Sequence, residues 1–278
     1  MIGRKTGSCF HRPAKIRLSY RMAQPIPEPD PEEPQITMTQ SRIQVVFFDA
    51  ADTLFHIHGS VADIYLQYAE KHGFKKTGES LGSIKAAFGR AFREAPPPVF
   101  AATEPAAIKQ SERLWWFDIV HNVFYRVGMF EGFDEFFEEV FAVFERSDSW
   151  RLFPETRDVL ATLKAQGFEL GIISNFDSRL FSVLRGLGIA DLFDTITISS
   201  LAHAAKPSAR IFQQALDKHA VDPADALHVG DSERDDVKGA QSVGLTGVLL
   251  ARGEPAHPSN GTTIANLNDL LPLLSRLQ

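Results

Sequence analysis

Short apolar runs alternate with longer amphipathic stretches between residues 154 and 250, and this alternation constrains the fold more than any other feature. The apolar runs have the length of strands and lie at 169–173, 194–198, 226–229 and 245–249. The amphipathic stretches have the length of helices and lie at 154–166, 179–187, 207–219 and 236–243. Strands and helices in this order form a parallel sheet covered by helices on both faces, so we predict an α/β fold. A further strand is expected at 43–48 and a final helix at 267–277.

A helical region interrupts this pattern after the first strand. Ser60 is suited to cap a helix over 61–71. Apolar residues recur at helical spacing further on, at Phe133, Phe136, Phe137, Val140, Phe141 and Phe144. We expect these rings to pack a helical bundle rather than to bind a ligand. Trp115 and Trp116 face different directions on a helix, so at most one of them is expected to face a ligand. We predict a core at 41–58 and 151–278 and a helical domain at 59–150.

The composition is that of an ordinary soluble globular protein. The chain has 278 residues, of which 44% are hydrophobic and 23% charged, and its formal net charge is -6. A nucleic-acid-binding protein should instead present a basic face. No apolar stretch approaches the roughly 20 residues that span a bilayer. We therefore expect neither nucleic acid nor a membrane as a partner. With Cys9 as the only cysteine, no disulfide framework is expected, and a cytoplasmic location is the default.

Residues 1–40 are expected to form a disordered tail. Its basic residues precede the first acidic residue, and prolines then alternate with acidic residues, a composition typical of extended, solvated chain. The basic start lacks the apolar segment of a secretory signal. A mitochondrial-type targeting peptide, or translation that starts at Met22 or Met38, is the alternative interpretation.

The first predicted strand ends in a carboxylate, Asp49. Active sites of open α/β sheets lie at the carboxyl ends of their strands. A carboxylate at that position can act as a nucleophile, because a covalent intermediate divides one difficult displacement into two easier ones. Asp49 is therefore our candidate nucleophile.

Two other predicted strands are followed by polar residues with a possible role at the same edge. Ser174 and Asn175 end the strand at 169–173, and a hydroxyl with backbone N–H groups at such a turn can bind an oxyanion or phosphate. Lys206 opens a helix after the next strand, where a fixed cation could neutralise Asp49 and an incoming anion. Taken singly, these residues also fit an ordinary turn and a surface lysine.

Acidic residues cluster after the strand at 226–229. Asp231, Asp235 and Asp236 follow Gly230 and repel one another unless a cation lies among them. Magnesium is the natural candidate, since it takes oxygen ligands from one or two carboxylates and keeps several waters. In isolation the segment also fits a solvated turn and helix cap.

These four segments, in this order, resemble the motifs of the haloacid dehalogenase (HAD) superfamily. Its Asp-x-Asp-Gly-Thr-Leu motif lines up with residues 49–54, and the resemblance extends over residues 43 to 255. It implies a Rossmann-like parallel-sheet core with an inserted α-helical cap domain, of the kind found in subfamily IA. The segments 115–116, 174–180 and 228–232 are similar to one group within the superfamily, that of haloacid dehalogenase-like hydrolase domain-containing protein 3.

The resemblance also implies a role for each matching residue. The catalytic residues would be Asp49, Ser174 and Lys206. The substrate would be bound by Thr53, Ser174, Asn175 and Lys206. Magnesium would be held by Asp49, the backbone carbonyl of Ala51, Asp231, and Asp236 or Asp235. The implied function is a magnesium-dependent phosphatase that acts on a small phosphorylated metabolite through an aspartyl-phosphate at Asp49.

Ala51 departs from the family motif, whose second aspartate acts as the general acid. The backbone carbonyl of alanine can still bind a metal, but its side chain cannot move a proton. Loss of a general acid or base typically lowers the rate by ~10²–10⁴-fold. Asp52 stands one residue further on, where an extended chain turns its side chain to the opposite side. His56 and His58 are expected to be ordinary linker residues rather than bases.

Two alternative functions remain open. A 2-haloacid dehalogenase also lacks the second aspartate, because a halide leaves without a proton. Dehalogenases use no metal, however, and do not keep the acidic segment that contains Asp231. The other alternative is a catalytically weak HAD protein with a binding or regulatory role. This is the weaker interpretation, because the chain retains Asp49, Ser174, Lys206 and Asp231.

Overall fold

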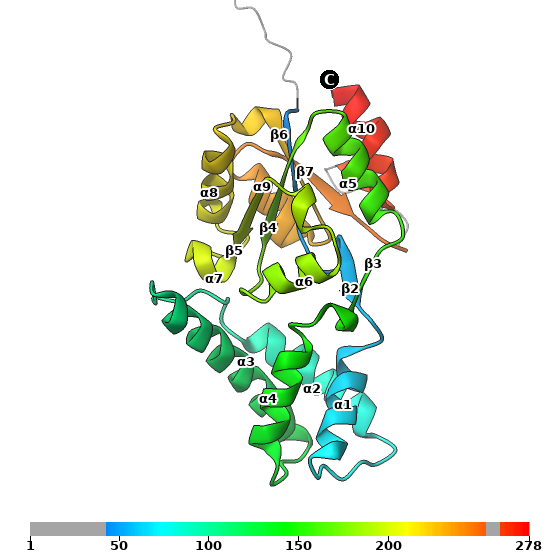
Figure 1. The fold of residues 1–278 in the computed structure, drawn as a ribbon, viewed down its shortest axis with the longest axis vertical. Coiled ribbons are helices and arrows are strands. Elements are labelled where there is room, and N and C mark those ends of the chain that lie inside the picture. The colour runs from blue at the N-terminus through cyan, green and yellow to red at the C-terminus, as the bar shows by residue number, and fades with distance from the viewer. Residues whose placement is uncertain (1–42, 254–261, 278) are drawn as a thin grey trace, which may run out of the picture. The chain divides into compact units, whose positions relative to one another are not determined.

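The predicted parallel sheet forms the centre of the protein. The computed structural model describes residues 43–253 and 262–277. Within these residues six strands pair in parallel, in the order β5-β4-β1-β6-β7-β8 (Figure 1). Their bounds are β1 (Val45–Phe48), β4 (Glu169–Ser174), β5 (Thr195–Ile198), β6 (Ala226–Gly230), β7 (Thr246–Leu250) and β8 (Thr262–Ile264). The predicted α/β fold is confirmed, and β8 is a strand that the sequence did not predict.

Helices cover both faces of this sheet. They are α5 (Thr156–Ala165), α6 (Leu180–Gly186), α7 (Ser199–Ala202), α8 (Ala209–His219), α9 (Gly239–Gln241) and α10 (Leu270–Leu277). Side chains alternate between the faces of a strand. In β1, Val45 and Phe47 therefore pack in one apolar cluster with α8 and α9, whereas Val46 and Phe48 pack in another with α5, α6 and α10. A strand buried on both faces must be apolar at every position, as β1 is.

The region between β2 and β3 is helical, and we call α1–α4 the helical segment. Its helices are α1 (Val61–Lys71), α2 (Ser80–Glu94), α3 (Pro105–Val127) and α4 (Phe133–Val143). Ser60 caps α1 as predicted, because its side chain accepts a hydrogen bond from the Asp63 N–H at 3.1 Å. The predicted aromatic stripe lies on α4, and Phe136, with no exposed surface, packs against Phe124 with ring centres 4.9 Å apart. These rings pack helices together as expected, and four residues of the stripe, Phe137, Val140, Phe141 and Phe144, also line a cavity.

A short two-stranded sheet joins the helical segment to the rest of the chain. β2 (Phe55–Ile57) pairs antiparallel with β3 (Trp150–Leu152). His56 lies in β2, where its ring packs against Phe153 at 4.9 Å and its Nδ1 lies 2.9 Å from the Ile57 carbonyl. The helical segment lies beyond the carboxyl ends of the central strands (Figure 1).

Two predicted helices differ in their form. The helix expected at 236–243 starts earlier, as a π-helical turn, η4 (Glu233–Lys238), which runs into α9. The turn is wide because the Ser232 carbonyl accepts from the N–H groups of both Asp236 and Val237. The helix expected at 267–277 begins with a 3₁₀ turn, η5 (Leu267–Asp269), before α10. Other 3₁₀ turns are η1 (Ser147–Ser149), η2 (Ala190–Leu192) and η3 (Pro223–Asp225).

The expectation of a disordered tail at 1–40 lies outside the described residues, as does Cys9. Among the helices that the structure describes, none combines the length and the apolar character that crossing a membrane requires.

Candidate active site at the carboxyl edge of the sheet

Strand register brings three of the predicted site segments together. In the central strand β1, Phe48 is level with Ile172 of β4 and with Val229 of β6. The next residues of all three strands therefore emerge at the same edge. The N–H of Asp49 extends the ladder, donating to the Val229 carbonyl at 2.9 Å.

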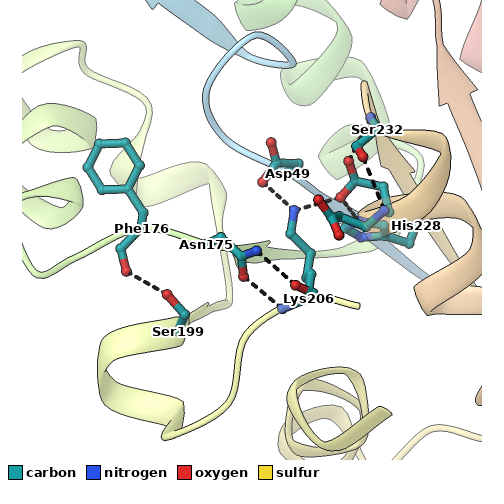
Figure 2. Close-up of polar contacts among 9 residues, drawn as sticks. Asp49, Asn175, Phe176, Ser199, Lys206, His228 and Ser232 are labelled. Atoms are coloured by element: carbon teal, nitrogen blue, oxygen red, sulfur yellow. Dashed lines mark hydrogen bonds and ion pairs between the residues drawn. The ribbon is translucent and has the colours of Figure 1, made fainter. Parts of the chain in front are cut away.

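Lys206 lies between two carboxylates at this edge. Its Nζ donates to Asp49 Oδ1 at 2.5 Å and to Asp236 Oδ1 at 2.6 Å (Figure 2). All three residues are buried. Such a buried arrangement is stable only because each charge has a partner of opposite sign within hydrogen-bond distance. The hypothesis of a fixed cation beside Asp49 therefore agrees with the geometry.

Asn175 holds Lys206 in place. Its Nδ2 donates to the Lys206 carbonyl at 3.0 Å, and its Oδ1 accepts from the Lys206 N–H at 2.7 Å (Figure 2). Both ends of the amide are thus used on one backbone unit 31 residues away. The side chain acts in this structure by positioning the lysine.

Asp236 is oriented by groups that the sequence analysis did not single out for this purpose. His228, fully buried in β6, donates from Nε2 to Asp236 Oδ1 at 2.8 Å, and the Ser232 N–H donates to Oδ2 at 3.0 Å. The sequence did contain an indication of its role, because His228 is a polar residue in the middle of an otherwise apolar strand. Gly230 makes room for this carboxylate, since a Cβ at that position would lie 2.1 Å from Asp236 Cγ.

Three carboxylates form a group that could hold a metal ion. Asp49, Asp231 and Asp236 each offer an oxygen, and these atoms all lie within 4.8 Å of one another. Carboxylate oxygens are the ligands that Mg²⁺ prefers, so the donor set fits this ion. Asp235 lies outside the group, with its carboxylate 3.8 Å from Arg234.

Burial and charge perturb the acids of this group in different directions. Burial, with the neighbouring Asp49 and Asp236, raises the pKa of Asp231 to about 7. Burial also raises the pKa of Asp49, against the opposing charge of Lys206. Burial acts in the same direction on Asp236, but Lys206 and then His228 outweigh it, so that the pKa of Asp236 is lowered. For Lys206 burial is outweighed by the two carboxylates, which hold its pKa above the ordinary value.

The remaining predicted residues lie near this edge. Ser174 ends β4 and is buried, and its Oγ forms no hydrogen bond with the part of the chain that the structure describes. Thr53 is fully buried, and its Oγ1 has no partner among the described residues. Ala51 is half-buried, and Asp52 is exposed in a left-handed conformation with φ of 61°. Partial burial of its carboxyl group raises the pKa of Asp52, and His56 opposes this effect.

A buried network links the helical segment to the chain that follows β4. Trp116 donates from Nε1 to Asp177 Oδ2 at 2.6 Å, and Arg179 forms two further bonds to the same carboxylate at 2.7 and 2.9 Å. Beside it Glu112 of α3 accepts from the N–H of Ser178 at 2.9 Å and from its Oγ at 2.5 Å. Trp116 points toward the sheet and Trp115 bonds the Pro96 carbonyl, in agreement with the prediction that the two rings face different directions.

A cavity of about 900 Å³ adjoins the site. Ala51, Asp52 and Asn175 line it on the side of the sheet, and residues of all four helices of the helical segment line it on the other side. The carboxylate group and the cavity are therefore neighbouring parts of one region.

Comparison with known proteins agrees with this architecture. Haloacid dehalogenase-like hydrolase domain-containing protein 3 of Bos taurus is 29% identical, over 85% of this chain and 96% of its own. Glyceraldehyde 3-phosphate phosphatase of Methanothermobacter thermautotrophicus is 26% identical, over 83% of this chain and 98% of its own. The structure of 2-haloacid dehalogenase from Pseudomonas syringae pv. Tomato DC3000 is similar with a TM-score of 0.58 and 25% identity, over 85% of this chain and 100% of that one.

The profile of one enzyme family, described as haloacid dehalogenase-like hydrolase, matches residues 43–244, which include β1 and the segments that carry Ser174, Lys206 and Asp231. The match thus covers the sheet edge as well as the inserted helices. The chain belongs to the haloacid dehalogenase-like hydrolases.

Proposed function

We propose that this hydrolase is a magnesium-dependent phosphatase that acts on a small phosphorylated molecule, with Asp49 as the nucleophile. The observation that carries the proposal is the pairing of Asp49 with Lys206 beside two further carboxylates, Asp231 and Asp236. An acidic group of this kind suits a reaction in which a cation must offset the charge of an incoming phosphoryl group. The similarity to a glyceraldehyde 3-phosphate phosphatase supports the same reaction class.

In this proposal Asp49, Asp231, Asp236 and the carbonyl of Ala51 hold the ion. When bound, Mg²⁺ supplies positive charge that offsets the repulsion between the carboxylate and the phosphoryl group. Lys206 fixes one oxygen of Asp49, which leaves the other to attack phosphorus. Ser174, whose hydroxyl at the end of β4 has no partner among the described residues, donates a hydrogen bond to the phosphoryl oxygens, and Thr53 and Asn175 support the binding site.

The reaction then has two steps. Asp49 forms a bond to phosphorus while the bond to the leaving oxygen breaks, and the electron pair departs on that oxygen. Water next attacks the aspartyl-phosphate, which releases phosphate and restores the carboxylate. Since Ala51 cannot donate a proton to the leaving oxygen or take one from the water, both steps lose general acid–base assistance, which is typically worth ~10²–10⁴-fold in rate.

Dehalogenation is the second candidate function, because Ala51 would not impede a leaving halide and a 2-haloacid dehalogenase is among the similar structures. The paired acids Asp231 and Asp236 make it the weaker candidate, since a halide displacement has no use for a cation there.

We also propose that the helical segment acts as a cap over the site, and that neither nucleic acid nor a membrane is a partner.

A phosphate-release assay with and without Mg²⁺ tests the proposal. We expect release that requires Mg²⁺ and that falls to background in Asp49→Asn, because an amide cannot act as the nucleophile. Asp235→Asn is the matched control, since Asp235 lies outside the carboxylate group and should keep its activity. Metal-independent chloride release from 2-chloropropionate, with no phosphate release from any ester, would instead establish the dehalogenase. Turnover unchanged in Asp49→Asn would contradict both functions.

A further inference from the structure

The cavity beside the site has aromatic walls. Rings of the helical segment and of its flanks line it, at Tyr65, Phe88, Trp116, Phe141 and Trp150. Flat aromatic side chains offer large apolar surfaces. Burial of a ligand ring against them is favourable, because apolar area is removed from water and because the rings make edge-to-face contacts. The lining thus suits a flat apolar group better than a sugar or a polyol, whose hydroxyls would lose their hydrogen bonds to water.

Lys85 and Arg179 both line the cavity, and the charge of the second is already neutralised. Arg179 is buried and forms two hydrogen bonds with Asp177, and its guanidinium lies 4.1 Å from the ring centre of Phe141. Its Nη1 donates to the Phe141 carbonyl at 3.2 Å. A second acidic group on the substrate would therefore compete with Asp177 for this arginine. An acidic group on the ligand is therefore not expected to bind at Arg179.

Tyr65 supplies one polar atom in the apolar wall. The residue is only 2% exposed, it lines the cavity, and its hydroxyl forms no hydrogen bond with the part of the chain that the structure describes. Its ring is held by Phe88, Phe136 and Phe144, with ring centres 5.6, 6.2 and 5.8 Å away. Burial raises its pKa, so the hydroxyl stays protonated and can donate. A hydroxyl that borders the cavity, with no protein partner among the described residues, can donate to a polar atom on the ligand.

Ala51, which also lines the cavity, restricts the leaving group. Without a general acid the leaving oxygen must depart as an anion, and an aromatic hydroxyl tolerates this far better than an aliphatic one. We propose that the substrate is an aryl phosphate, the phosphate monoester of an aromatic alcohol, with its ring in this cavity and a polar substituent at Tyr65. The proposal rests on the proposed function and specifies its substrate class.

The chemistry balances without a further reactant. Asp49 bonds to phosphorus, the phosphorus–oxygen bond to the ring breaks, and the aryloxide leaves with the electron pair and takes a proton from solvent. Water then cleaves the aspartyl-phosphate to inorganic phosphate. No group at position 51 is needed for the first step.

Four phosphate compounds separate the ring from the leaving group. Phenyl and 2-naphthyl phosphate have leaving groups of similar acidity but differ by a fused ring, acetyl phosphate has a good leaving group and no ring, and glycerol phosphate has neither. We expect kcat/KM to be roughly tenfold higher for the naphthyl than for the phenyl ester, because more apolar area is buried. Glycerol phosphate should be poorer than the naphthyl ester by at least that factor, and acetyl phosphate, whose leaving group is more acidic, should show the missing ring as a KM at least tenfold higher.

A matched pair of variants on α2 tests the cavity itself. Gly89 lines it, and a Cβ there would meet only the flexible end of Arg93 at 3.3 Å, so that Gly89→Leu fills the cavity without breaking the helix. Gly82 lies on the same helix, outside the cavity, with nothing within 4 Å of its Cβ position. We expect Gly89→Leu to lower the naphthyl-to-acetyl ratio of kcat/KM at least tenfold, and Gly82→Leu to leave the ratio unchanged.

Tyr65→Phe tests the polar atom. We expect it to lower kcat/KM more for a naphthyl phosphate that carries a hydroxyl group than for the unsubstituted ester, by roughly tenfold, because one hydrogen bond is lost. Tyr125→Phe is the control, since Tyr125 is 74% exposed.

Binding of 2-naphthyl phosphate to Asp49→Asn, measured by calorimetry, gives a readout that does not depend on turnover. Adding Gly89→Leu to that variant should weaken the binding.

The outcomes are distinguishable. If no ester releases phosphate, the proposed function fails. If phosphate is released but glycerol phosphate matches the naphthyl ester in kcat/KM, if acetyl phosphate matches it in KM, or if Gly89→Leu does not change the ratio, the substrate class is wrong and the phosphatase stands.

Discussion

The sheet edge and the helical segment contribute opposite kinds of chemistry to one region. At the edge, Asp49, Lys206 and Asp236 form a buried chain of ion pairs, and each is held by backbone or by a neighbouring polar group. In the helical segment the buried groups are mostly apolar, and they include rings such as Phe124 and Phe136. The ion pairs depend on the register of the strands, and the packing of the rings depends on helical periodicity. The difference indicates that the edge performs the reaction and the helices select what reacts.

The two regions meet in the buried network around Asp177. Trp116 and Arg179 bind this carboxylate from opposite sides of the boundary. Because the bonds come from both regions, the network sets how the cavity wall lies relative to the site. Among the substitutions below, one at this boundary is therefore expected to cost the most stability.

Asp177→Asn should cost about 3–5 kcal/mol of stability, because the buried Arg179 would lose the negative partner of an ion pair that is 2.7 Å long. Urea denaturation followed by circular dichroism measures the loss. The matched control is Asp148→Asn, which removes an Arg–Asp pair of the same two-residue separation on the surface and should cost less than about 1 kcal/mol. Equal losses in both variants would show that the buried network does not stabilise the boundary.

Gly230→Ala tests the sheet edge. A new Cβ would collide with Asp236 at 2.1 Å, so we expect about 1–3 kcal/mol of lost stability from overpacking and a weaker Mg²⁺ site. Thermal unfolding with and without Mg²⁺ separates the two effects. If Mg²⁺ still raises the melting temperature as much as in the unchanged protein, Asp236 is not a ligand.

The affinity for Mg²⁺ should depend on pH through Asp231. Its pKa of about 7 in the metal-free site means that below this pH a proton must leave before a cation binds. The dissociation constant should therefore rise by up to about tenfold for each pH unit below that value and level off above it. Calorimetric titrations in buffers of different ionisation enthalpy measure both the affinity and the proton release. A constant affinity between about pH 6 and pH 8 would contradict the expectation, and Asp231→Asn should reduce the pH dependence.

The smallest effect is expected in the helical segment. Gly89→Ala should raise the free energy of unfolding by about 0.5–1 kcal/mol, since alanine has the higher helix propensity and its Cβ meets only the flexible end of Arg93. The same urea denaturation measures it. If Gly89→Ala stabilises the protein while Gly230→Ala destabilises it, the helix surface has room for a methyl group and the packed strand end does not. A loss at Gly89 would mean that the cavity wall is as tightly packed as the edge.

Features that depend on neighbours in the chain could be predicted. The strands, the cap at Ser60 and the aromatic stripe on α4 follow local periodicity, and the position of Asp49 follows from a strand end. The pairing of Asn175 with Lys206 could not be predicted, because it joins residues 31 apart through a turn whose path depends on β5. The partner of His228 was hidden for a different reason: a π-helical turn brings Asp236 back toward the strand.

The order of residues alone specified an α/β fold with a parallel sheet, the four polar segments and the alanine at position 51. It did so because strand and helix periods, and the residues that follow strand ends, are written locally in the chain. Three-dimensional packing specified which acids meet, with Asp236 inside the carboxylate group and Asp235 outside it. It also placed the hydroxyl of Tyr65 in an aromatic cavity beside Ala51. Such contacts join distant elements, and their distances depend on register and helix packing, which no local pattern encodes.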